Sequence, residues 1–188
     1  MEKYISKKEK ASYGFAAVGS YMVAGITQSY LMYFFTDILI IPSAFVMMLM
    51  IVARVWDALN DPMMGVIVDR TSTKYGKMRP YVLVGSFLML FTTIVLFMPL
   101  TGAPTMFKMI FAAVSYIIFG MAYTLTDVPA MGLMSVATPS SDERASLLSF
   151  YVTVGSVGSL LPVGLLTIFQ SFIPEKYVYF AMSIFVGI

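Results

Sequence analysis

Long apolar stretches, interrupted at intervals by turn-forming residues, constrain the fold of this chain more than any other feature. A helix needs about 20 mostly apolar residues to cross the hydrocarbon core of a bilayer, and the sequence offers such a length repeatedly. The predicted spans are residues 12–36, 44–68, 81–101, 106–134, 147–171 and 177–188. Proline, glycine and charged residues gather in the breaks at 40–43, 101–105, 138–143 and 172–176. The pattern predicts an all-α polytopic membrane protein.

The composition agrees with a chain that has lipid as its solvent. Hydrophobic residues make up 59% of the sequence and charged residues 12%, whereas soluble domains carry about 45–50% and about 25%. A net charge of +2 is too small to indicate a nucleic-acid partner. Because the chain has no cysteine and no histidine, disulfides, thiol nucleophiles, Ser-His triads and the usual zinc sites are excluded.

The first ten residues, MEKYISKKEK, are basic and precede an apolar run longer than that of a secretory signal. We therefore expect residues 1–11 to form a cytoplasmic tail and residues 12–188 to form a transmembrane bundle. The sixth apolar stretch reaches Ile188 after about half a span. This predicts a fragment with an incomplete sixth helix, and the alternative is a natural half-length protein that encloses a cavity as a homodimer.

The distribution of Lys and Arg predicts the orientation of the bundle. With the N-terminus inside, two segments on the other face hold only Lys108 and Lys176. The cytoplasmic segments hold nine basic residues: Lys3, Lys7, Lys8, Lys10, Arg70, Lys74, Lys77, Arg79 and Arg144. This asymmetry satisfies the positive-inside rule and places the chain in the cell membrane with a cytoplasmic N-terminus.

The second span carries three charges at membrane depth. Arg54, Asp57 and Asp61 are spaced i, i+3 and i+7, so they share one face of a helix. A charge inside a membrane costs about 2.5–3.5 kcal/mol on insertion scales and usually pairs or faces a water-filled cavity. Arg54 can neutralise one carboxylate, which leaves the other for a proton or a small cation.

Asn60 adds a neutral oxygen beside Asp61, and a hard cation such as Na⁺ prefers oxygen ligands. The residues therefore predict a Na⁺ or H⁺ site at Asp57 and Asp61. The alternative is a buried ion-pair network that only holds helices together, although one positive and two negative charges do not balance.

The fourth span is interrupted by Tyr123, Thr124, Thr126 and Asp127, and Pro129 follows. Proline frees a carbonyl one turn earlier and can kink the helix. A carboxylate with hydroxyl groups at a kink suits hydrogen bonding to a polyol or completion of a cation site. The alternative for the two threonines is a hydrogen bond to their own helix backbone, but that alternative does not account for Asp127.

By composition alone, the segment GVIVDRTSTKYGKMRP at 65–80 is a charged cytoplasmic loop between two helices. Its spacing resembles the signature between the second and third helices of the major facilitator superfamily. In that signature the glycine allows close helix approach and the Asp/Arg pair is a conformational latch. The matching residues here are Gly65, Asp69, Arg70, Gly76, Lys77 and Arg79.

The chain as a whole resembles the N-terminal half of the glycoside–pentoside–hexuronide:cation symporter family, which includes melibiose permease. The matching stretches are SYGFAAVG, YLMYFFTDIL, ARVWDALNDPMMGVIVDRT, YGKMRPY and GMAYTLTDVP, in family order over residues 10–150. The resemblance implies the N-terminal six-helix bundle of a twelve-helix transporter, with the C-terminal six-helix half absent from this sequence.

The resemblance also implies roles for individual residues. The coupling cation would bind at Asp57, Asn60, Asp61 and Thr124, with Arg54 as their charge partner. The sugar would contact Tyr21, Gln28, Tyr123 and Asp127. Four sugar contacts of melibiose permease are changed. Its Lys-Asp pair corresponds to Ser20 and Tyr21, its sugar-stacking tryptophan to Met131 and its fifth-helix arginine to Val152. We therefore expect a substrate other than melibiose, and a neutral sugar, because Val152 replaces an arginine.

The fifth span places Gly155, Ser156, Gly158 and Ser159 close together. Small residues let helices approach closely in lipid, so we expect a packing role, and room for a substrate is the alternative.

The sequence thus predicts a secondary transporter that couples a sugar or glycoside to Na⁺ or H⁺ by alternating access. No bond is broken in such a cycle, so we expect neither enzymatic activity nor a cofactor other than the coupling cation. The alternative is a structural or signalling membrane protein in which the acids only hold helices together.

Overall fold

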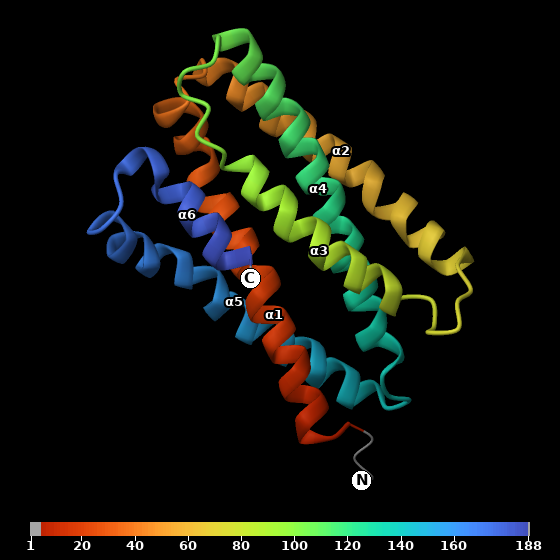
Figure 1. Ribbon diagram of the computed structural model, residues 1–188. Helices are drawn as coiled ribbons and strands as arrows, with labels where there is room; N and C mark the ends of the chain where they lie inside the picture. The colour runs from red at the N-terminus through yellow and green to blue at the C-terminus, as the bar shows by residue number, and fades with distance from the viewer. Residues whose placement is uncertain (1–4, 188) are drawn as a thin grey trace.

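The computed structural model describes residues 5–187, so Lys3 of the basic tail and Ile188 of the sixth predicted span lie outside it. The described residues form helices and no strand, which confirms the all-α prediction (Figure 1). The elements in chain order are α1 (Lys7–Tyr33), the π-helical turn η1 (Phe34–Ile38), α2 (Ser43–Arg70), α3 (Arg79–Leu96), α4 (Thr105–Val136), α5 (Ser141–Gln170) and α6 (Glu175–Gly187).

The helices lie in two groups (Figure 1). In one group α4 packs against both α2 and α3, and in the other α1 packs against α5 along much of its length. Contacts of α6 with α1, α3 and α5 join the two groups. Between them, an aromatic cluster of Phe34, Phe97 and Tyr179 fills the core, and the ring centroids of Phe34 and Phe97 lie 5.3 Å apart.

Two helices begin earlier than the hydrophobic pattern predicts, because serine caps extend them. The α1 helix begins at Lys7, where Ser6 accepts a hydrogen bond from the Glu9 N–H at 3.2 Å and donates its own N–H to the Glu9 carboxylate at 2.8 Å. This reciprocal pair is a capping box. The Ser6 N–H and the Ser6 hydroxyl both donate to the Glu9 carboxylate, and these two hydrogen bonds hold the pKa of the Glu9 carboxyl below the ordinary value. The α5 helix likewise begins at Ser141, where the Ser140 hydroxyl accepts the N–H of Glu143.

The α3 helix ends at Leu96, five residues before the end of the predicted span at 101. Pro99 explains the difference, since a proline pushes the preceding residue out of the helical region. Phe97 is the C-cap of the helix, and its N–H donates to the carbonyls of Thr93 and Val95.

Lys108 does not lie in a loop, as the count of basic residues assumed. It belongs to the first turn of α4, is buried, and donates its ammonium hydrogen to the carbonyl of Leu39. Leu39 directly follows η1, and Ile40 after it has a φ of 56°. The lysine therefore satisfies a carbonyl at the end of a helix, where a cation is favoured.

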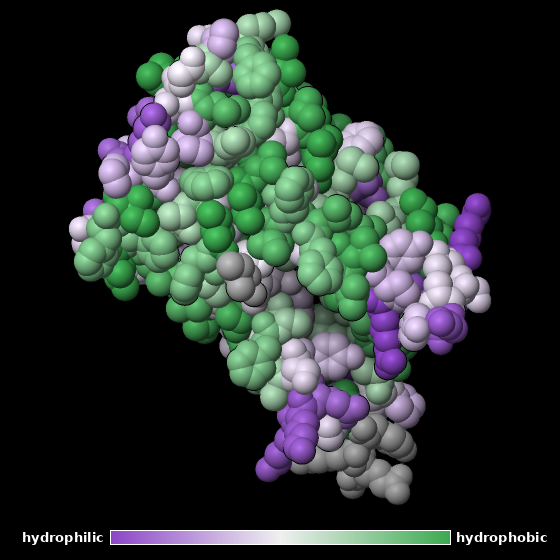
Figure 2. All heavy atoms as spheres, viewed as in Figure 1, coloured by the Kyte–Doolittle hydropathy of each residue, from purple (hydrophilic) through white to green (hydrophobic). Residues whose placement is uncertain are grey.

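The surface of the described residues fits a membrane environment. Apolar side chains cover the faces of the helices, and hydrophilic residues gather at their two ends (Figure 2). By length and composition, α2, α3, α4 and α5 can each cross a membrane. The α1 helix has 27 residues but carries more polar side chains, and 13 residues of α6 are described.

The small residues of α5 bring its backbone against α1, as the sequence predicts. A Cβ atom added at Gly158 would lie 3.0 Å from the Cα of Val18, and one added at Gly155 would lie 2.8 Å from the Tyr21 ring. On the α1 side, a Cβ at Gly25 would come within 2.9 Å of the Cα of Ser159. Glycine is therefore required at these positions for the two helices to approach so closely.

Candidate cation and sugar site

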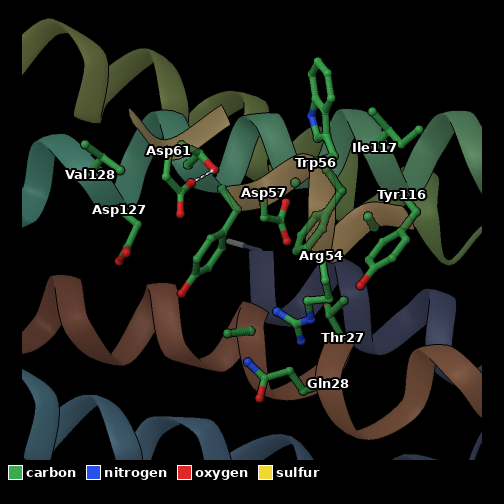
Figure 3. A pocket seen from close by; sticks show the side chains of 16 residues that line it. Thr27, Gln28, Arg54, Trp56, Asp57, Asp61, Tyr116, Ile117, Asp127 and Val128 are labelled. Atoms are coloured by element: carbon green, nitrogen blue, oxygen red, sulfur yellow. Dashed lines mark hydrogen bonds between the residues drawn. The ribbon is translucent and has the colours of Figure 1, made fainter. Parts of the chain in front are cut away.

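A cavity of about 200 Å³ lies between α1, α2 and α4 (Figure 3). Its charged lining consists of Arg54, Asp57 and Asp61 of α2 and Asp127 of α4. Three carboxylates therefore face one guanidinium. In a low-dielectric environment such an imbalance favours a bound cation or proton. The cavity brings together most of the residues that the sequence singles out.

Asp61 is fixed by a hydrogen bond between helices. The Thr124 hydroxyl of α4 donates to Oδ1 of Asp61 at 2.8 Å, as the dashed line in Figure 3 marks. Asp57 lies one turn earlier on α2, opposite Gly120, where an added Cβ would be 3.1 Å from its Oδ1. The missing side chain at Gly120 thus leaves room for the carboxylate. Two carboxylates and a hydroxyl from two helices face the same space.

The two threonines of α4 behave differently. Thr126 donates its hydroxyl to the carbonyl of Ala122 at 3.1 Å, which is the backbone alternative considered for both residues. Thr124 makes the contact with Asp61 instead. The backbone alternative is thus correct for Thr126 and wrong for Thr124.

Asp127 lines the cavity from α4 without a hydrogen-bond partner among the described residues. Its carboxylate points into the open space in Figure 3. The α4 helix runs on through Pro129 to Val136. A half-buried carboxylate with free acceptor positions is suited to accept hydrogen bonds from a ligand hydroxyl.

Arg54 shares the cavity with the acids but forms no ion pair within 4.0 Å among the described residues. In Figure 3 its guanidinium reaches from α2 toward Gln28 of α1. Both residues line the cavity. The role of Arg54 as charge partner of Asp57 and Asp61 therefore stays a prediction.

Two predicted ligands do not line the cavity. The Asn60 side chain is buried on α2, and its Nδ2 has no hydrogen-bond partner among the described residues. Tyr21 packs against Gly155 and meets the Tyr151 ring edge-on at 6.0 Å between centroids. Because α1 presses against α5 here, the Tyr21 ring lies within the helix interface.

The cavity residues that the sequence analysis did not single out include Trp56, Tyr116 and Gly120. Tyr116 lies seven residues before Tyr123 and eleven before Asp127, so all three share a face of α4. The polar stripe of α4 could therefore have been extended to Tyr116 from its spacing. Trp56 carries no comparable signal, because an aromatic residue in an apolar helix is ordinary.

The residues predicted to form the latch lie at the end of α2, in the loop that follows it and at the start of α3. Lys77 donates to the backbone carbonyl of Asp69 at 3.1 Å, and Gly76 has a φ of 94°, which favours glycine. A Cβ added at Gly65 would meet no other described residue within 4 Å, so the role of Gly65 in close helix approach stays a prediction. Asp69, Arg70 and Arg79 are exposed, and their role as a latch stays a prediction.

The described residues contain no group of three or more His, Cys, Asp or Glu side chains placed to hold a metal ion. Asp57, Asp61 and Thr124 offer two carboxylates and one hydroxyl instead. That donor set is all oxygen and carries two negative charges, and oxygen donors are the ligands that hard cations prefer.

The family described as MFS/sugar transport protein matches residues 12–188. This chain belongs to that family. The match includes all the residues that line the cavity, and it confirms the resemblance to the sugar:cation symporters of the major facilitator superfamily.

Relatives agree with this assignment. The chain is 36% identical to the inner membrane symporter YicJ of Escherichia coli over 84% of its length and 34% of that protein. It is 33% identical to the putative glycoside/cation symporter YagG of Escherichia coli over 86% of its length and 35% of that protein. It is 30% identical to the isoprimeverose transporter of Lactiplantibacillus pentosus over 81% of its length and 32% of that protein. These names describe membrane transporters and not enzymes.

The chain thus spans about a third of the length of the relatives it matches.

Proposed function

We propose that the chain forms the cation-binding half of a symporter that moves a sugar or glycoside together with Na⁺ or H⁺. The observation that carries the proposal is the pairing of Asp61 with Thr124 across α2 and α4, beside Asp57, in a cavity with three carboxylates and one guanidinium. A site with excess negative charge inside a membrane binds a cation, and the sugar supplies hydroxyl groups to Asp127.

The names of two relatives, a putative glycoside/cation symporter and an isoprimeverose transporter, support a sugar as the cargo. We propose a neutral sugar, because Val152 offers no charge to an anionic one and the acids of the cavity outnumber its single arginine. We favour Na⁺, with H⁺ and Li⁺ as the alternatives, because the donors are all oxygen atoms, which hard cations prefer.

Alternating access requires a partner for this bundle. Transporters of this kind bind their cargo near the midplane between two halves that rock against each other. The relatives are about three times as long as the matched region. We propose that a second six-helix half covers the cavity, so that cation binding neutralises the acids and sugar binding then permits the rocking motion.

The proposal is tested with Asp57→Asn and Asp61→Asn in the product of the complete gene. Each change removes a charge from the cavity while keeping the side-chain shape. We expect Na⁺-driven sugar accumulation in membrane vesicles to fall by at least about tenfold, since contacts to charged groups contribute about 1.5–3 kcal/mol. Asp37→Asn is the matched control, because Asp37 is an exposed carboxylate outside the cavity.

Unchanged accumulation in the Asp57→Asn, Asp61→Asn double variant would contradict the cation site. Uptake that follows a proton gradient and ignores Na⁺ would keep the site and replace Na⁺ with H⁺ as its ion.

We also propose that the N-terminus and the loop between α2 and α3 face the cytoplasm. The burial of Lys108 leaves Lys176 as the exposed basic residue on the opposite face. Because the sequence has no cysteine, single cysteines can be introduced directly. Cysteines at Ser6, Ser72 and Ser141 should resist an impermeant external thiol reagent, and one at Thr105 should react. The reverse pattern would refute this orientation.

A further inference from the structure

One buried lysine takes no part in the proposed binding of cation or sugar. Lys108, in the first turn of α4, is 6% exposed and does not line the cavity between α1, α2 and α4. Its ammonium group donates to the carbonyl of Leu39, and its remaining N–H groups have no acceptor among residues 5–187. Burying a charge is costly unless the charge is paired and hydrogen-bonded. A single carbonyl offsets only part of that cost, so helix capping alone does not account for a full charge at this position.

The carbonyl that Lys108 binds belongs to a turn with an unfavourable backbone conformation. It lies in the peptide unit that joins Leu39 to Ile40, and Ile40 has a φ of 56°. A β-branched residue adopts this left-handed conformation only where surrounding contacts hold it. The next peptide unit is held as well, because the Ile41 N–H donates to the carbonyl of Phe35 at 2.9 Å. These two hydrogen bonds fix both peptide planes of the turn that leads from η1 into α2.

The Lys108 contact joins the two groups of helices. The η1 turn continues α1, which belongs to one group, whereas Lys108 belongs to α4 in the other. Within the described residues, α1 and α4 make little direct contact. Figure 1 shows the start of α4 and the corner between η1 and α2 at the same end of the bundle, away from the N-terminus. The aromatic cluster also joins the groups, but apolar packing is non-directional, whereas a hydrogen bond fixes a distance and an angle.

The contact lies on the same side of the cavity along both of these helices. Lys108 precedes the cavity residue Tyr116 by eight residues, which corresponds to about 12 Å along α4. Leu39 follows the cavity residue Gln28 by eleven residues. Because a helix is a stiff element over two or three turns, a displacement at the contact is passed on to the cavity residues. The Lys108 hydrogen bond therefore sets how far the α1 wall and the α4 wall of the cavity stand apart at this end.

The two proposed ligands depend differently on the spacing of the walls. The proposed cation ligands, Asp57, Asp61 and Thr124, all belong to α2 and α4, which lie in one group. The proposed sugar contacts lie on both walls, with Asp127 on α4 and Gln28 on α1. Separation of the walls would therefore leave the cation ligands together and move the sugar contacts apart.

We propose that Lys108 is a positioning residue for sugar binding. Its hydrogen bond to the Leu39 carbonyl holds the α1 wall and the α4 wall at the spacing that the sugar requires, and the lysine itself does not touch the cargo. The effect on sugar binding rests on the proposed function, whereas the effect on the spacing of the helices does not.

The first measurement separates sugar affinity from cation affinity in the product of the complete gene. Lys108→Met keeps most of the side-chain volume and removes the N–H donors. With methyl β-D-xyloside as the probe, we expect the concentration for half-maximal Na⁺-driven uptake in vesicles to rise by about 3- to 10-fold, as the loss of one sugar hydrogen bond implies. The affinity for Na⁺ alone, measured by calorimetry, should change by less than about twofold. Lys108→Arg keeps the charge and a donor and should recover most of the sugar affinity.

The second measurement follows the spacing of the walls directly and needs no cargo. Spin labels are attached to cysteines at Met32 of α1 and Met106 of α4, which are exposed at the Lys108 end of the bundle, in a background without other cysteines. Their distance distribution should be longer or broader in Lys108→Met than with the lysine present. A second pair at Phe15 of α1 and Val136 of α4, exposed at the other end, should change less.

Lys176→Met is the matched control, because Lys176 is an exposed lysine at the same end of the bundle and outside the cavity. It should leave both affinities and both distances unchanged. If Lys108→Met does not fold, Lys108→Gln gives the same comparison with a shorter, uncharged polar side chain.

Equal weakening of sugar and Na⁺ binding by Lys108→Met would overturn the proposal, because a general loss of structure has that result. Unchanged sugar affinity or an unchanged distance between the labels at 32 and 106 would overturn it as well. If the wild-type protein shows no cation-dependent uptake of any glycoside, the proposed function fails, and the role in sugar binding fails with it. The label distances then still decide whether Lys108 sets the spacing of the two walls.

Discussion

The interface of α1 with α5 and the interface of α2 with α4 hold the same bundle together by opposite means. Between α1 and α5, glycines at 25, 155 and 158 let backbone and ring atoms meet with no space for a methyl group. Between α2 and α4, the Thr124 hydroxyl bonds the Asp61 carboxylate across a cavity. The α1–α5 interface is closely packed because its glycines lack side chains, whereas polar side chains line a cavity at the α2–α4 interface.

This difference follows from what can stabilise helices in lipid. Apolar side chains gain little by leaving lipid for a protein interior, so association depends on close van der Waals contact or on hydrogen bonds between helices. Close contact leaves no room for a ligand, whereas polar contact leaves donors and acceptors that a ligand can also use. The fixed α1–α5 pair is thus suited to serve as a frame, and the α2–α4 pair is suited to respond to what it binds.

The comparison makes its strongest prediction at Gly25. Gly25→Ala would place a methyl group 2.9 Å from the Cα of Ser159. Overpacking typically costs about 1–3 kcal/mol, and we expect the upper end of that range because a backbone cannot rotate away. The apparent Tm of the purified protein should fall by roughly 6–12 °C, given about 2–4 °C per kcal/mol for a chain of this size.

Gly19→Ala on the same helix is the matched control, since a methyl group there would meet no other described residue within 4 Å. It should keep or slightly raise the Tm, because alanine stabilises a helix interior by about 0.5–1 kcal/mol relative to glycine. Equal Tm values for the two variants would show that the α1–α5 interface accommodates a methyl group without loss of stability. That result would contradict the close packing that distinguishes α1–α5 from α2–α4.

The sequence predicts those parts of each interface whose residues can be recognised by their spacing within a single helix. The acids of α2 are predictable, because Arg54, Asp57 and Asp61 fall on one helix face by spacing alone. The polar stripe of α4 is predictable in the same way, and its regular spacing reaches back to Tyr116. Capped helix starts are local as well, since Ser6 and Ser140 each precede a glutamate by three residues.

Local spacing patterns do not predict contacts between segments that lie far apart in the sequence. Lys108 bonds a carbonyl 69 residues away, and a count of basic residues places it in a loop. Tyr21 was expected to contact the substrate, but the register of α1 against α5 sets its ring on Gly155. Asn60 stands next to Asp61 in sequence yet does not line the cavity, because neighbours on a helix point about 100° apart.

The smaller prediction concerns Thr124 and tests whether the α2–α4 contact serves binding rather than packing. Thr124→Val keeps the shape of the side chain and removes the hydroxyl that donates to Asp61. A hydrogen bond to a charged group contributes about 1.5–3 kcal/mol, so we expect Na⁺ to stimulate sugar uptake with an affinity about 10- to 100-fold weaker. Thr124→Ser restores the donor and should recover most of the affinity.

Thr126→Val separates this effect from a general cost of losing a hydroxyl on α4. Its hydroxyl bonds the Ala122 carbonyl of its own helix, so its removal should leave Na⁺ affinity within about twofold. If Thr124→Val lowers the apparent Tm but not Na⁺ affinity, the hydrogen bond to Asp61 joins two helices and does no more. If Na⁺ affinity falls while the Tm is kept, the carboxylate needs the Thr124 hydroxyl to hold it in position for the cation. The second result is expected, because Asp61 is exposed to the cavity and a free carboxylate there can turn away from the ion.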